Sequence, residues 1–143
     1  MIIPAETIEA YRNTRYEVFD GNNTISFRIG ESCKPLSDLF RRFDIQSSVF
    51  ITAWNPFGNS LADEENKLAN NGLRTLLTDN GIEYLEGAGV GNETKWPPEM
   101  SLLAFGVSQD QASELCRHFK QNAVVFIGPD YVPILLLHPD TEI

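Results

Sequence analysis

Apolar residues recur along the chain with two periods, one typical of helices and one typical of strands. Leucine and phenylalanine residues between 36 and 43 fall at intervals of three and four, which predicts an amphipathic helix that begins near Pro35. The same spacing predicts helices over 61–80 and from Ser108 onward, where Ser108 and Gln111 match a capping box. Pro4 suits the first turn of a short N-terminal helix.

Alternating or continuous apolar runs bounded by turn residues predict the strands. They are expected over 15–19, 24–29, 49–53, 82–86, 100–106, 123–127 and 132–137. Strands interspersed with helices indicate an α/β or α+β sandwich, with helices packed on a mixed β-sheet. No repeat, low-complexity tract or linker divides the chain, so residues 1–143 are expected to form a single globular domain.

Charge is unevenly distributed along the chain, whose formal net charge is −9. Residues 1–45 carry six basic and seven acidic side chains, whereas residues 46–143 carry five basic and thirteen acidic ones. Nucleic-acid binding depends on Lys and Arg displacing counterions from phosphates, so this balance argues against it. It favours a basic protein partner, although it is also explained by solubility alone.

Several features point to a cytoplasmic protein that is not embedded in a membrane. No apolar run approaches the roughly 20 residues that span a bilayer, and the N-terminus lacks the basic and apolar regions of a signal peptide. Cys33 and Cys116 lie far apart, which favours two thiols over a disulfide. With only His118, expected in solvent, and His138, expected in a loose tail, we predict neither a metal site nor a cofactor.

The stretch from Phe50 to Gly58 predicts a buried strand that runs into an Asn-Pro turn before the long helix. Ligands commonly bind at such junctions, where strand ends and a helix N-terminus meet. Asn55 either shapes the turn or presents its amide to a ligand. Asn66 lies on the flank of the helix's apolar arc, and we expect it to hold the Asn55 loop from behind.

Other candidate side chains lie later in the chain. Glu99 and Ser101 flank the entry to a strand and, by alternation, share one face of it. Gln121 is either a cap of the last helix or a site residue, and Trp54 and Trp96 are candidate aromatic walls. None of the GxSxG, HExxH or GxGxxG motifs occurs, so no covalent or metal-dependent mechanism is indicated.

Four short motifs carry a family resemblance: Thr52-Ala53-Trp54-Asn55-Pro56, the helical Asn66, the Glu99 that precedes a strand, and Phe119-Lys120-Gln121-Asn122-Ala123. Over about residues 10–137 the chain resembles DUF3293, a bacterial family of unknown function. The family brings no activity with it.

Two functions follow from these observations. The first is a non-catalytic protein-binding module, for example an inhibitor or immunity protein for a basic partner. The alternative is a small-ligand-binding protein or enzyme whose candidate ligand-binding residues lie at or near the strand-to-helix loop. Those residues are Trp54, Asn55, Asn66, Trp96, Glu99, Ser101 and Gln121.

Overall fold

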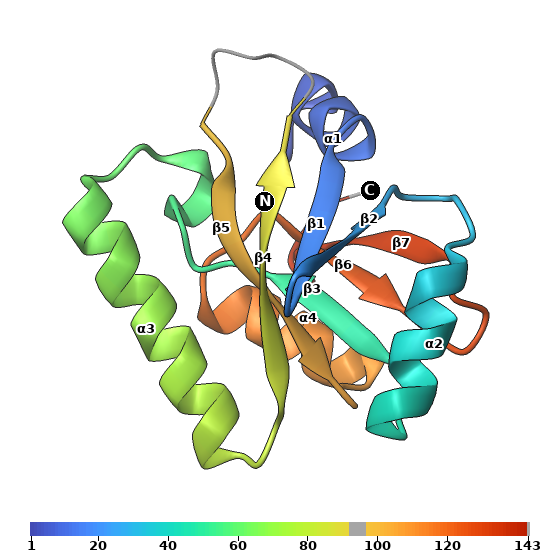
Figure 1. Ribbon diagram of the computed structural model, residues 1–143. Coiled ribbons are helices and arrows are strands. Elements are labelled where there is room, and N and C mark those ends of the chain that lie inside the picture. Colours follow the sequence, from blue (N-terminus) through green and yellow to red (C-terminus); the bar gives the residue numbers. More distant parts are fainter. Residues whose placement is uncertain (92–96, 143) are drawn as a thin grey trace.

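The computed structural model describes residues 1–91 and 97–142, which form seven strands, four α-helices and one 3₁₀-helix (Figure 1). In chain order the elements are α1 (Ala5–Arg12), β1 (Arg15–Asp20), β2 (Asn23–Phe27), α2 (Lys34–Phe43), β3 (Ser48–Ile51), η1 (Pro56–Gly58), α3 (Asp63–Asp79), β4 (Tyr84–Val90), β5 (Glu99–Phe105), α4 (Gln109–His118), β6 (Ala123–Ile127) and β7 (Pro133–Leu137).

The seven strands form one sheet in the order β2-β1-β4-β5-β3-β6-β7. Every pairing among these strands is antiparallel, so the α+β alternative is confirmed and the sheet is not mixed. Two of these six pairings follow directly from the connections. β1 and β2, and likewise β6 and β7, are neighbours joined by short turns, and a short turn between adjacent strands requires them to be antiparallel.

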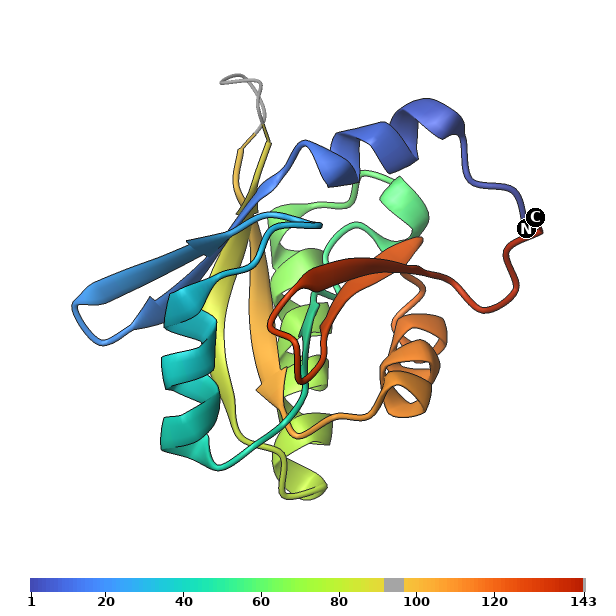
Figure 2. The ribbon, with the colours of Figure 1, turned by 90° about the vertical axis from the view of Figure 1, so that its right-hand side faces the viewer.

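The sheet curls into a half-barrel, so that its two edge strands approach each other (Figure 2). The backbone N–H of Gly30, just after β2, donates to the carbonyl of Pro133 at the start of β7, at 2.8 Å. Pro133 has no N–H to offer, so it contributes its free carbonyl. This bond brings together the two ends of a sheet that remains otherwise open.

Helices cover both faces of the sheet. On the convex face, α3 and α4 bury Leu73, Leu77 and Leu115 against strand residues that include Ile51 and Leu102. On the concave face, α2 buries the Leu36, Leu39 and Phe40 side chains that the periodicity predicts to be apolar and inward. The two cores lie on opposite sides of β3, which explains why all four residues of that strand are buried.

Among the four described α-helices, only α4 has a side-chain cap at its N-terminus. The capping box at Ser108 is confirmed, because its hydroxyl accepts from the Gln111 N–H while the Gln111 side chain accepts from the Ser108 N–H. Helix α3 begins at Asp63, two residues after the predicted start, and no side chain caps it. The backbone N–H of Leu61, at the predicted start, instead donates to the Asn55 side chain.

The prediction that His138 lies in a loose tail is wrong. Its side chain is only 5% exposed. Its backbone N–H donates to the Asn122 carbonyl, and its Nδ1 accepts from the Asp140 N–H at 3.0 Å. His118, by contrast, is exposed as predicted. None of the described helices is long and apolar enough to cross a bilayer.

Candidate functional site

The strand-to-helix junction is built on a reciprocal contact between two asparagines. Asn55 adopts a left-handed conformation, with φ 46°, which asparagine tolerates better than most residues. The Asn66 side chain accepts from the Asn55 N–H at 2.8 Å and donates to the Asn55 Oδ1 at 2.7 Å. That same Oδ1 accepts from the Leu61 N–H. As predicted, Asn66 holds the loop from behind.

A second buried amide, Asn70, fixes the end of β3 to β5. Its Oδ1 accepts from the Ala53 N–H at 2.8 Å, and its Nδ2 donates to the Met100 carbonyl at 3.1 Å. The Thr52 hydroxyl donates to that carbonyl as well, at 2.6 Å. We did not predict this role for Asn70, although its position one helical turn after Asn66 places both amides on one face.

Gln121 joins the junction to the end of α4. Its side-chain amide donates to the Phe119 carbonyl at 3.1 Å and to the Trp54 carbonyl at 3.4 Å. The Phe57 N–H donates to the Lys120 carbonyl, and both residues have left-handed backbones. Strained backbone of this kind persists only where surrounding contacts enforce it, and the backbone bond between Phe57 and Lys120 is one such contact.

The amides of the junction are therefore engaged within the protein. Asn55, Asn66, Asn70 and Gln121 all use their side chains on the loop or on neighbouring strand ends. An amide that is already bonded offers less to a ligand than a free one. The geometry supports a structural role for these residues. The three asparagines, Asn55, Asn66 and Asn70, form the asparagine frame of the loop.

Glu99 differs from the amides because it stands at the concave face with its carboxyl group removed from much of the solvent. It opposes Gly89 on β4, which in turn opposes Tyr16 on β1, so the three lie in one row across the sheet. Burial raises the pKa of the Glu99 carboxyl to about 7. At neutral pH this group can both accept and donate a proton.

Tyr11 extends from α1 toward the same region. Burial raises the pKa of its hydroxyl and the negative charge of Glu99 raises it further, while a hydrogen bond from Asn122 acts in the opposite direction. That bond, from Asn122 Nδ2 to the Tyr11 hydroxyl, measures 3.4 Å. The Tyr16 hydroxyl donates to the Tyr11 carbonyl at 2.8 Å and so ties α1 to the sheet. Tyr11 carried no distinctive sequence signal, whereas Asn122 lies in the motif from Phe119 to Ala123.

The remaining predicted site residues are placed as follows. Ser101 is buried, on the same face of β5 as Glu99, and its hydroxyl donates to the Glu99 carbonyl at 3.0 Å. Trp54 is half-buried beside the asparagine frame. Trp96 lies outside the described residues. Cys116 is buried, and burial raises the pKa of its thiol to about 12, which leaves it protonated and unreactive at neutral pH.

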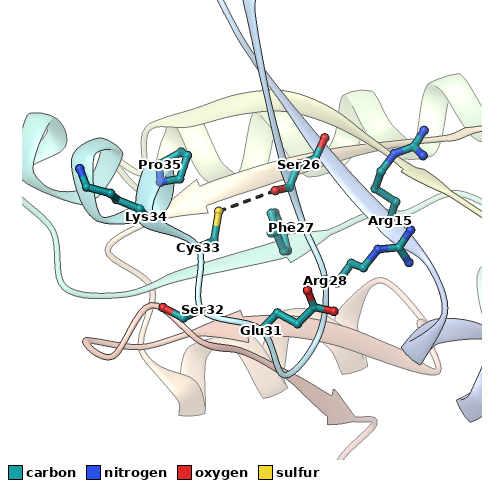
Figure 3. A pocket seen from close by; sticks show the side chains of 9 residues that line it. All are labelled: Arg15, Ser26, Phe27, Arg28, Glu31, Ser32, Cys33, Lys34 and Pro35. Carbon is teal, nitrogen blue, oxygen red and sulfur yellow. Dashed lines mark hydrogen bonds between the residues drawn. The ribbon is translucent and has the colours of Figure 1, made fainter.

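A surface hollow of about 330 Å³ lies elsewhere, between the end of β2 and the start of α2 (Figure 3). Three of its lining residues are basic, but Arg15 pairs with Glu17 and Lys34 with Asp38. Figure 3 shows Lys34 on one side of the hollow and Arg15 and Arg28 together on the other. The basic groups therefore do not converge on a common point.

Acidic side chains gather on the helices of the convex face. Residues 63–83 and 109–118, which comprise α3, α4 and the turn into β4, carry seven acidic and three basic side chains. Helix α2, on the opposite face, carries three basic side chains and one acidic one. The charge asymmetry along the sequence thus becomes a difference between the two faces of the molecule.

Within residues 1–91 and 97–142, no group of three or more His, Cys, Asp or Glu side chains is placed to hold a metal ion. The two described thiols, Cys33 and Cys116, are free.

Comparison with known proteins identifies one family. The model of a family described as "Protein of unknown function (DUF3293)" matches residues 51–124, which run from the end of β3 to the start of β6. This segment contains the asparagine frame, Glu99 and both helices of the convex face. No curated protein and no solved structure matches the chain significantly.

Proposed function

Because the chain belongs to the DUF3293 family, whose description assigns no activity, we propose a function from its own geometry. The protein is a non-catalytic protein-binding module that uses the acidic helical face formed by α3 and α4 to bind a basic protein. An inhibitor or immunity protein for a basic enzyme is the specific form that this proposal takes.

The observation that carries the proposal is the gathering of carboxylates on one layer. The three basic residues of that layer are already paired, Lys67 with Glu64, Arg74 with Glu86, and Arg117 with both Glu114 and Asp140. Five carboxylates make no ion pair with the described residues, and these are Asp63, Glu65, Asp79, Glu83 and Asp110. A surface with excess negative charge attracts and orients a positively charged partner.

The internal use of the loop amides also supports this proposal over ligand binding at the Asn55 loop. Asn55, Asn66 and Gln121 would have to give up hydrogen bonds within the protein to bind a ligand, at a cost that the ligand would need to offset.

The experiment is affinity capture from a lysate with matched charge variants. One variant neutralises the acidic face through Glu64→Gln, Glu65→Gln, Asp79→Asn and Glu83→Gln. The control removes the same charge from the α1 and α2 side through Glu6→Gln, Glu9→Gln, Glu31→Gln and Asp44→Asn. All eight positions are exposed.

We expect the wild type and the control to capture a stoichiometric basic protein at low salt, and the face variant to lose it. Release of that protein at about 0.5 M salt would fit an electrostatic contact, since screening shortens the reach of charges to a few ångströms. Equal loss in both variants would show that only the net charge matters, and would overturn the proposal of a specific face.

A second function, small-ligand binding or acid–base chemistry at Glu99, is favoured by one observation. Burial raises the pKa of the Glu99 carboxyl to about 7, and the negative charge of Glu99 contributes to the raised pKa of the Tyr11 hydroxyl, a combination typical of functional sites. A metabolite screen by thermal shift tests it, with Glu99→Gln compared against Glu83→Gln, whose carboxylate is exposed. A metabolite that stabilises the wild type and Glu83→Gln but not Glu99→Gln supports this function.

We also propose that the protein works in the cytoplasm. Two free thiols that neither pair nor approach a metal site suit a reducing compartment. Fractionation of cells that express a tagged protein tests this.

A further inference from the structure

The outward side of α3 carries two residues that the fold itself does not explain. Leu68 is 71% exposed, more than any other large apolar side chain within the described helices and strands. Gly72 is exposed as well, one helical turn later, and a methyl group added to it would meet nothing within 4 Å. An apolar side chain in water and a glycine inside a helix both disfavour the isolated fold.

Both residues lie on one stripe of the helix. The buried side of α3 is formed by Asn66, Asn70, Leu73 and Leu77. At 100° per residue, Leu68 points directly away from these four, and Glu64, Gly72, Thr75 and Asp79 lie along the same outward stripe. Figure 1 shows α3 along one side of the molecule with no other element on its outer flank.

We propose that this stripe docks an amphipathic, basic α-helix of a partner protein. The inference rests on the proposed function and specifies that the partner binds through an α-helix. Leu68 is the apolar contact, and Gly72 leaves a gap into which a partner's side chain or backbone fits, as ridges fit grooves between packed helices. Glu65 near one end and Asp79 at the other face the basic residues of the partner, whereas Glu64 is paired with Lys67 in the isolated protein.

The charges of the stripe argue against a second copy of this chain as the occupant. In an antiparallel pair of α3 helices, Glu64 and Glu65 of one copy would face Asp79 of the other. In a parallel pair, identical carboxylates would face each other. Like charges across an interface oppose association, so a basic helix is the better complement.

The test uses three synthetic peptides of equal length as probes. The first has leucines at helical spacing on one face and lysines on the other. The second has the same composition in scrambled order, and the third has glutamate in place of lysine. Binding is measured by titration calorimetry, and the contact is mapped by NMR shifts of the backbone amides of the full chain.

We expect the amphipathic basic peptide to bind and to shift signals along Glu64–Asp79. Leu68→Ala and Gly72→Leu are each expected to weaken its affinity at least tenfold. Ile134→Ala, which removes an exposed apolar side chain from β7, is the matched control and should leave the affinity within twofold. Melting curves verify that each variant is folded.

The inference of a docking stripe is overturned if the amphipathic and scrambled basic peptides bind equally, or if wild type and Leu68→Ala have equal affinity. Either result remains compatible with the proposal of a basic partner. Failure of both basic peptides to bind at low salt contradicts the proposed function as well. Sedimentation that shows a dimer dissociated by Leu68→Ala would overturn the inference in favour of a second copy.

Discussion

Asn55 and Asn66 bind each other through two hydrogen bonds, one to a backbone N–H and one between side chains, across the loop that joins β3 to α3. The pair holds Asn55 in its left-handed conformation, and Asn66 itself is only 1% exposed. A loop whose shape depends on one buried amide is sensitive to the loss of that amide.

Asn66→Ala is therefore expected to lower the free energy of unfolding by about 2–3 kcal/mol, because the Asn55 N–H loses its buried acceptor and a small cavity forms. Urea unfolding followed by circular dichroism measures this. Asn71→Ala, at an exposed position on the same helix, is the control and should change stability by less than about 0.5 kcal/mol. An unfolding midpoint for Asn66→Ala equal to that of the control would contradict the role of the pair.

Glu99 should make stability depend on pH. Its ordinary pKa of 4.5 rises to about 7 in the folded protein. Between these values the folded state holds a proton that the unfolded state has released, so the group's contribution falls as pH rises through this window. We expect Glu99→Gln to remove this dependence of stability on pH. Above pH 7 its free energy of unfolding should be about 2–3 kcal/mol higher than that of the wild type.

Denaturant unfolding at several pH values between 4.5 and 8 measures this effect. Glu83→Gln, at an exposed carboxylate, should follow the wild type throughout. Profiles of the wild type and Glu99→Gln that stay parallel over the whole range would show that the Glu99 carboxyl remains solvated.

Local patterns predicted most elements of this fold, because periodicity and capping act within a few residues. The β6 strand and the capping box of α4 coincide with the prediction. The curl of the sheet and the order of its strands could not be predicted, since they depend on contacts between distant residues such as Gly30 and Pro133. The same reason explains why the burial of His138 was missed.

The candidate site likewise contains one part that local patterns predicted and one part that they did not. The link between Asn55 and Asn66 was predictable, because a polar amide beside an apolar helical arc needs a nearby partner. Asn122 donates to the Tyr11 hydroxyl, and the charge of Glu99 acts on that same hydroxyl. These residues belong to three segments that are far apart in the chain, and no local pattern shows that they influence one another. Whether the candidate residues bind a ligand stays a prediction.

Gly87 and Gly89 are expected to respond differently to the same substitution. A Cβ at Gly87 would collide with the Glu17 carbonyl oxygen and lie 3.0 Å from the Phe50 ring, whereas at Gly89 the nearest atom, in Thr14, is 3.7 Å away. Gly87→Ala should therefore cost about 3 kcal/mol or more, because two strands must separate. Gly89→Ala should leave stability unchanged or raise it by up to about 1 kcal/mol. Thermal unfolding of both variants checks this, and equal losses would mean that the strands adjust freely around Gly87.

Gly72 and Gly81 provide a second contrast, this time between two glycines that are both open to solvent. Gly72 lies inside α3 with an ordinary helical backbone, so Gly72→Ala should raise the free energy of unfolding by about 0.5–1 kcal/mol. Gly81, beyond the end of α3, has φ +70°, a conformation in which a Cβ is strained. Gly81→Ala should lower stability by about 1 kcal/mol. Denaturant unfolding of the two variants measures both effects. A loss of stability in Gly72→Ala would mean that the fold itself needs this glycine, and would remove the reason to connect Gly72 with a partner.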